Sequence, residues 1–180
     1  MTQHTSKPTA KQFGQRRRKE PMSEEGAGAP PNIPPENVEK KRNDYNRVVR
    51  QARLISIILD NVDFDIKPEA VAADKASIKR NISSDAQLVS FDSEDGSCFA
   101  KIVWKVDVHH NRKKIVKCKA SYVVMYDNIK ECPNEVVNIF VENVARPATY
   151  AFFRALYAHL DWSAGLASPP LPVVRYLPKV

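Results

Sequence analysis

The sequence predicts an α+β domain, in which a four-stranded antiparallel sheet is followed by two C-terminal helices and an extended apolar tail. Two observations carry this prediction. Between residues 52 and 126, runs of alternating apolar and polar residues are typical of half-buried strands, and after Pro133 the apolar spacing changes to a helical period. Because all the strands precede the helices, the order is that of an α+β fold and not of an alternating α/β fold.

The four strands are expected at about residues 52–66, 76–91, 100–109 and 116–126. The second run is the weakest, and we expect it to bend around residues 83–85. The third run alternates most cleanly, with one face made of Ala100, Ile102, Trp104, Val106 and Val108. A turn at Asn111 separates it from the fourth run, whose apolar face continues the pattern. These two runs predict a long hairpin with Trp104 and the facing tyrosines in the core.

Two helices are expected after the sheet. Apolar residues at helical spacing over 136–144 indicate the first, and Pro147 is expected to break it and to begin the second. The apolar stripe of the second helix consists of Phe152, Phe153, Leu156, Tyr157 and Leu160. The prolines within 169–172 exclude a helix there, so the C-terminal remainder is expected to be extended.

Residues 1–48 are expected to form a disordered, basic and proline-rich tail, and residues 49–180 the folded domain. Segment 1–35 contains six of the 13 prolines and three of the five glycines, with few large apolar side chains. Such a segment buries too little surface to offset its conformational entropy. Charged residues dominate from Glu36 to Arg50, where we expect a frayed helix that leads into the domain.

The net charge of +7 is concentrated near the N-terminus. Residues 1–50 hold 11 Lys and Arg against 6 Asp and Glu, a balance of +5, whereas residues 51–180 hold 17 against 15, a balance of +2. A nearly balanced domain offers no strongly basic docking face. We therefore expect nucleic-acid binding from the tail rather than from the domain.

The sequence also indicates a cytoplasmic protein that does not insert into membranes. No apolar run approaches the ~20 residues that a bilayer crossing needs. The basic run Arg16–Lys19 is followed by acidic and polar residues and not by the apolar stretch of a secretory signal. Cys98, Cys118 and Cys132 are odd in number and lack metal-binding spacing, which is typical of reduced thiols.

No arrangement typical of catalysis, of a metal site or of a cofactor is found in the sequence. His109 and His110 lie at the expected hairpin tip among cations, which disfavour a bound metal. Cys118 lies on the apolar face of a strand and is interpreted as a structural thiol. Asp63 and Asp65 share a strand face, where an ordinary solvated surface is a better interpretation than a catalytic pair. Phosphate-binding loops and nucleophile elbows are absent, so we expect no enzyme.

More apolar residues are present than one such domain can cover. Two helices cover one face of a four-stranded sheet, and apolar residues remain in the first strand, in the 67–82 connection and in the C-terminal tail. This surplus predicts oligomerisation, a surface for extended polypeptides, or both. Burial between subunits would account for it by itself.

Three local patterns, in this order, resemble the SecB family of preprotein-export chaperones and their SecB-like relatives over about residues 50–178. They are the acidic and hydrophobic end of the first strand, Asp60 to Asp65; the cysteine midway along the last strand, Cys118; and the arginine-bearing helix from Tyr150 to Arg154 followed by the proline-rich tail from Pro169 to Val173. The resemblance implies a homotetramer and an ATP-independent chaperone, or holdase, that binds unfolded or extended polypeptides for protein export or for an antitoxin client.

The resemblance also implies site residues. We place the client-binding surface along Phe64, Ile66, Val71, Ile78, Tyr126, Leu171 and Val174. Carboxylates on the sheet would dock a partner, and here these are Asp60, Asp63 and Asp65. Export members use an acidic sheet to dock the SecA motor, whereas this chain has Lys119 directly after Cys118 and Asn61 where an acid is usual. This basic character argues against SecA docking and favours an antitoxin over unfolded preproteins as the client.

A second hypothesis, from a different functional class, is a nucleic-acid-associated adaptor. It would use the basic tail and the cation-rich hairpin from His109 to Lys119. The sequence lacks the RNP motifs that display aromatic residues on an RNA-binding sheet, so the chaperone hypothesis is preferred.

Overall fold

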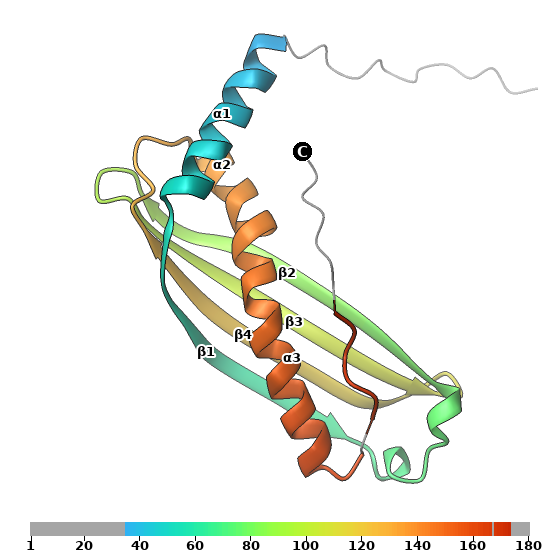
Figure 1. Cartoon of the computed structure of the whole chain (residues 1–180). Helices are drawn as coiled ribbons and strands as arrows, with labels where there is room; N and C mark the ends of the chain where they lie inside the picture. Colours follow the sequence, from blue (N-terminus) through green and yellow to red (C-terminus); the bar gives the residue numbers. More distant parts are fainter. Residues whose placement is uncertain (1–34, 167, 174–180) are drawn as a thin grey trace, which may run out of the picture. The chain divides into compact units, whose positions relative to one another are not determined.

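The computed structural model describes residues 35–166 and 168–173 of the chain (Figure 1). In chain order the elements are α1 (Pro35–Gln51), β1 (Arg53–Ile66), the 3₁₀ turns η1 (Pro68–Ala70) and η2 (Lys75–Ser77), β2 (Ile78–Asp92), β3 (Ser97–His110), β4 (Lys113–Asp127), α2 (Asn134–Phe140), the π-helical turn η3 (Val141–Ala145) and α3 (Arg146–Ser163). The disorder predicted for residues 1–34 and the predicted site residue Val174 lie outside the described residues. None of the helices in the described ranges could span a membrane.

The four strands form one antiparallel sheet in the order β1-β4-β3-β2, so β3 and β4 are central and β1 and β2 are the edges. The predicted α+β fold and its central hairpin are confirmed. Trp104 of β3 is paired with Ala120 of β4, and the pairing continues to the tip, where Asn111 and Arg112 form the turn with positive φ angles of 48° and 66°.

The predicted bend of the second strand around residues 83–85 is wrong. These residues pair one by one with β3, and the register of β2 shifts instead between Leu88 and Ser90. The polar residues at 83–85 alternate in phase with their neighbours, so no side chain there has to change face. The bulge includes Val89, which is exposed.

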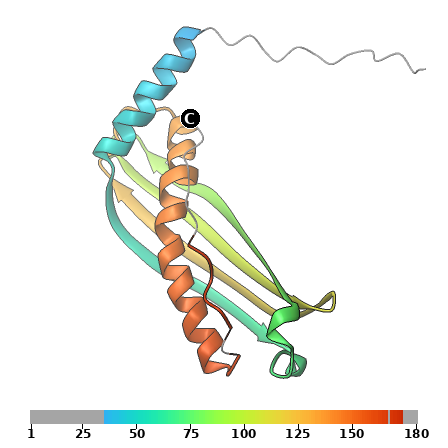
Figure 2. The ribbon, with the colours of Figure 1, turned by 45° about the vertical axis from the view of Figure 1, so that its right-hand side comes forward.

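One face of the sheet is covered by α2, η3 and α3, and the other face carries no element of the described chain (Figures 1 and 2). Trp104 lies at the centre of the covered face and is 2% exposed, which confirms it as a core residue. Its indole Nε1 donates a hydrogen bond of 2.8 Å to Thr149 Oγ1. Its ring packs against Tyr150 and Phe153, with centroid distances of 4.8 and 5.8 Å. These contacts fix the position of α3 on the sheet.

The predicted break between two separate C-terminal helices is wrong in detail, because α2, η3 and α3 follow one another without a gap. Pro147 lies in the first turn of α3, directly after the π-helical turn Val141–Ala145. A proline has no N–H, and its ring clashes with the carbonyl four residues earlier in an α-helix. The wider π-helical turn moves the preceding carbonyls out of α-helical register. The chain therefore passes the proline without leaving the helical path.

The helix predicted between residues 36 and 50 is confirmed as α1, which crosses the boundary that the sequence analysis drew between residues 48 and 49. Val48 is fully buried and packs into the core. Lys41 forms an ion pair of 2.8 Å with Glu135 of α2, and the Arg47 guanidinium donates to the Glu131 carbonyl oxygen at 2.7 Å. The last turns of α1 are therefore part of the folded domain.

The C-terminal residues 168–173 are extended, as predicted, and run beside α3 on the side of β2 (Figures 1 and 2). Leu171 is 1% exposed and completes the core at this side. Side chains of α3 and β2 hold the backbone of the segment by four hydrogen bonds. The Ser168 N–H donates to Asp161 Oδ2 (2.7 Å), and the carbonyl oxygens accept from Arg80 Nη1 at Pro169 (2.6 Å), from Arg154 Nε at Leu171 (2.8 Å) and from Tyr150 Oη at Pro172 (2.6 Å).

Candidate functional site

The edge strand β1 carries apolar side chains that the fold leaves exposed. Leu54, Ile55, Ile58 and Leu59 are 45%, 49%, 52% and 45% exposed. α3 packs over β2, β3 and β4, and the C-terminal segment lies on the β2 side of α3, so β1 is the strand that the helical layer covers least (Figures 1 and 2). A long edge strand with exposed apolar residues is a template for pairing with another extended chain.

Two bulges bring six apolar residues of β1 to one face, whereas Ile58, which pairs with Val123, points to the other face. The register against β4 shifts between Leu54 and Ser56 and again between Leu59 and Asn61, so one extra residue is inserted at each place. The side chains that point to the helical layer are consequently those of Leu54, Ile57, Leu59, Val62, Phe64 and Ile66, which we call the β1 surface. Without the bulges, strict alternation would separate these residues onto both faces.

A flank of α3 extends this apolar area. Phe152 is 53% exposed, and Leu156, one turn later, is half-buried. Arg154 and Tyr150 bind the C-terminal segment on the β2 side of the helix. Successive helical residues are rotated by about 100° around the axis. Phe152 and Leu156 therefore lie on the opposite flank of α3. The β1 surface and this flank therefore lie on the same side of α3.

The structure brings four of the predicted client-binding residues to one end of the sheet. Phe64 and Ile66 are half-buried at the end of β1, and Ile78 is half-buried at the start of β2. Val71 lies in the connection between these strands and is 67% exposed. The carboxyl end of β1 and the amino end of β2 lie at this end of the sheet, on opposite edges, because Ile66 pairs with Val116 and Ile78 with His110, both near the β3–β4 turn.

The structure places the other predicted client-binding residues in the core. Tyr126 is 5% exposed, and its ring meets Phe140 of α2 edge to face at 5.0 Å. It also lies eight residues along β4 from Cys118, the partner of Phe64, which separates the two by ~27 Å. Leu171 is also a core residue, with 1% of its surface exposed. Neither side chain is available at the surface of a single subunit.

The predicted client-binding residues did not include the four exposed apolar residues of β1, Leu54, Ile55, Ile58 and Leu59. A signal for them was present. Residues 54–59 are apolar on both faces of the strand, which is typical of a strand covered on both sides, whereas β1 is an edge strand with an open face. An apolar run in an edge position indicates that something outside the subunit covers it.

The three predicted docking carboxylates do not form an acidic patch. Asp60 forms an ion pair with Lys101 at 2.9 Å and accepts a hydrogen bond from the Ser121 hydroxyl at 3.0 Å. Both partners lower the pKa of the Asp60 carboxyl. Asp63 pairs with Lys117 at 3.0 Å, which raises the pKa of that lysine. Asp65 is exposed beside the same lysine. The lysines of the neighbouring strands therefore neutralise most of the acidic character.

The open face of the sheet carries further lysines. Lys105 of β3 lies directly opposite Lys119 of β4, and like charges in such a pair repel one another. Neither lysine takes part in an ion pair within the described part of the chain. These two adjacent lysines make this part of the open face locally basic, which favours an anionic over a cationic partner.

The buried thiols offer no reactive centre. Cys98, Cys118 and Cys132 are free and buried, and burial raises the pKa of Cys98 and of Cys118 to about 11. A thiol with such a pKa stays protonated near neutral pH and is a poor nucleophile. Among residues 35–166 and 168–173, no three His, Cys, Asp or Glu side chains gather as a metal site would require. What the described surface offers is apolar area and charge for binding.

Comparison with solved structures identifies the fold. The SecB-like chaperone of Mycobacterium tuberculosis, in complex with a peptide from the HigA1 antitoxin, superposes with a TM-score of 0.63 and 14% sequence identity over 74% of this chain and 96% of that one. The chain has the SecB-like fold. A protein of unknown function from Streptococcus agalactiae matches less well, with a TM-score of 0.42 and 15% identity over 68% of this chain and 98% of its own. No family model matches the sequence, and no curated protein is significantly similar to it.

Proposed function

We propose that this protein is an ATP-independent chaperone of the SecB-like kind, which binds unfolded or extended polypeptides. The observation that carries the proposal is the edge strand β1, whose backbone groups are unpaired on one side and whose apolar side chains are exposed. An extended client adds backbone hydrogen bonds along such an edge and buries its own apolar side chains beside it. Neither interaction requires a particular client sequence.

The expected affinity of one subunit is low. Each half-exposed Leu or Ile of β1 contributes about 1 kcal/mol when it is covered completely. Four such residues contribute about 4 kcal/mol, which is near the lower bound of the cost of association. Several sites on one assembly, bound by one long client, would raise the avidity. This is a reason for the homotetramer that the resemblance implies, and we include it in the proposal.

An antitoxin is the client that we favour over an exported preprotein. The SecB-like chaperone from Mycobacterium tuberculosis was solved with an antitoxin peptide. The lysines on the open sheet face, including the adjacent Lys105 and Lys119, oppose the docking of a basic export motor. Both clients would be met in the cytoplasm, where we place the protein. The nucleic-acid adaptor hypothesis for residues 1–48 and the hairpin from His109 to Lys119 stays a prediction.

The decisive experiment measures aggregation of a chemically denatured test protein by light scattering after dilution into buffer without ATP. We expect the wild-type protein to suppress scattering at a stoichiometric ratio. Leu59→Lys places a charge on the β1 surface and should abolish most of this suppression. Val89→Lys is the matched control, because Val89 is 61% exposed on the other edge strand. Circular dichroism and sedimentation report the folding and the mass of each variant.

Two results would contradict the proposal. Wild-type protein that leaves the aggregation unchanged would exclude the chaperone function. Equal suppression by the folded Leu59→Lys variant would exclude the β1 surface as the client site, even if the function itself were correct.

A further inference from the structure

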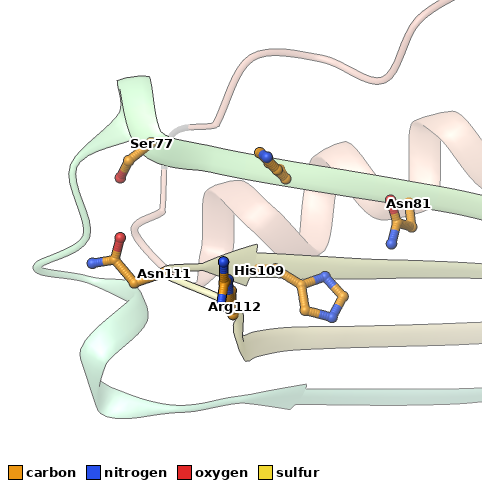
Figure 3. Close-up of a pocket in the computed structure, with 6 residues that line it drawn as sticks. Ser77, Asn81, His109, Asn111 and Arg112 are labelled. Carbon is orange, nitrogen blue, oxygen red and sulfur yellow. The ribbon is translucent and has the colours of Figure 1, made fainter. Parts of the chain in front are cut away.

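A cavity of about 540 Å³ lies at the tip of the β3–β4 hairpin, on the open side of the sheet. Figure 3 shows the side chains that line it, which come from the end of η2, the start of β2, the end of β3 and the turn between β3 and β4. They are Ser77, Lys79, Asn81, His109, Asn111 and Arg112. This cavity lies at the other end of the sheet from α1 and on the other face from α3 (Figure 1).

The residues that line the cavity favour the binding of an anion. Its described residues are a lysine, an arginine and a histidine, together with amides and a hydroxyl, and none of them is a carboxylate. Within the described chain, Lys79 and Arg112 take part in no ion pair, whereas the nearby Lys114 is paired with Asp107 at 2.8 Å. Converging unpaired cations with additional hydrogen-bond donors favour a bound carboxylate or phosphate.

Arg112 has a conformation that disfavours its own side chain. A two-residue hairpin turn with both φ angles positive prefers Asn-Gly, and here the φ angles of Asn111 and Arg112 are 48° and 66°. Asn fits the first position, but at the second an arginine is strained where glycine would not be. The sequence therefore has a cation at this rim at the expense of stability, which points to a role outside folding.

We propose that this cavity binds carboxylates of an acidic peptide segment from a partner protein. The lysine pair Lys105 and Lys119 continues the site along the same face, because Lys105 is four residues before His109 on β3, a separation of ~13 Å. An extended peptide of about four residues spans that distance. A partner segment with acidic residues near both ends would thus neutralise the cavity and the lysine pair together.

Nucleic acid is the other polyanion that such cations attract, and two observations argue against it. No Phe, Tyr or Trp is found among the described residues that line the cavity, so bases would lack a stacking surface. Asp65 and Asp85 lie exposed on the same sheet face, form no ion pair within the described chain, and would repel a continuous phosphate backbone. A peptide of mixed sequence avoids this repulsion because its charges are spaced by neutral residues.

The test measures the binding of a fluorescent acidic peptide to the full chain by anisotropy. The neutral control is the same peptide with Asn in place of Asp and Gln in place of Glu. A single-stranded RNA oligonucleotide is the second probe. Arg112→Gly removes the cation and relieves the strained turn. We expect this variant to melt about 2–4 °C higher than the wild type while its affinity for the acidic peptide falls about five- to tenfold. Lys79→Gln should weaken binding similarly without the gain in melting temperature. Lys40→Gln, an exposed site on α1, should change neither quantity.

The result that overturns the proposal is an acidic peptide that does not bind, or that binds Arg112→Gly as tightly as the wild type. Tighter binding of the RNA, lost with the same two variants, would also overturn it, since it would assign the cavity to nucleic acid. The proposal goes beyond the chaperone function and does not depend on it. Suppression of aggregation measured on the same variants keeps the two apart, because we expect Arg112→Gly to suppress aggregation like the wild type.

Discussion

Gly96→Ala tests how the turn between β2 and β3 is joined to the segment that enters α2. Gly96 has φ of 76°, and its carbonyl accepts the Ile129 N–H at 3.0 Å. A Cβ on Gly96 would lie 2.9 Å from the backbone nitrogen of Ile129, a residue that is fully buried. The left-handed conformation costs an alanine about 1–2 kcal/mol. The contact adds about 1–2 kcal/mol, because a backbone atom of the core must move.

Gly165→Ala is the matched control, since Gly165 has φ of 70° and nothing lies within 4 Å of the added Cβ. It should lose only the conformational part. Urea unfolding followed by circular dichroism should therefore give a loss of about 1–2 kcal/mol for Gly165→Ala and about 2–4 kcal/mol for Gly96→Ala. In thermal unfolding the second variant should melt about 5–12 °C below the wild type. Equal losses for the two variants would refute the claim that the Gly96–Ile129 contact is tight.

Two further predictions concern the C-terminal segment and the open face. Leu171→Ala should lower the free energy of unfolding by about 2–4 kcal/mol, because the Leu171 side chain is 1% exposed. Urea unfolding measures this loss. A loss below about 1 kcal/mol would mean that the C-terminal segment does not complete the core. Lys101 and Ser121 lower the pKa of the Asp60 carboxyl in the folded protein. The ion pair of Asp60 therefore stabilises the fold at any pH above the pKa of the unfolded state. This stabilisation is lost as the pH falls through the lower pKa of the folded state. Carboxyl NMR should find the Asp60 midpoint below 3.8 and see it rise in Lys101→Met, and an unchanged midpoint would exclude the pairing.

The central hairpin was predictable because local sequence and tertiary environment agree there. Each apolar residue from Ala100 to Val108 alternates with a polar one, and a strand with one buried face requires that pattern. The order of strands and helices followed from the change of period after Pro133. Where local signals conflict, as at Pro147, the sequence could not show that a π-helical turn resolves the conflict.

The candidate site was less predictable because hydrophobicity does not tell burial from exposure. Tyr126 and Leu171 are as apolar as Leu54 and Leu59, yet the first two are core residues and the last two are about half exposed. The difference arises from the strand order and from the path of the C-terminal segment, which covers β2 and leaves β1 open. Both are non-local features. The bulges in β1, which set the faces of its side chains, likewise have no local sequence signature such as a glycine.

If two copies of the chain pair through the free edge of β1, a client loses the backbone hydrogen bonds along that edge, but the side chains of the β1 surface stay available to it. Pairing of the free edge with a second copy uses backbone N–H and C=O groups, which lie in the plane of the sheet. The side chains of Leu54, Leu59 and Phe64 point perpendicular to that plane, toward the helical layer. Two β1 strands paired edge to edge would therefore place two β1 surfaces side by side and enlarge the apolar area for a client. The Leu59→Lys variant separates assembly from client binding, because a charge on the perpendicular face should remove client binding and leave the mass of the assembly unchanged.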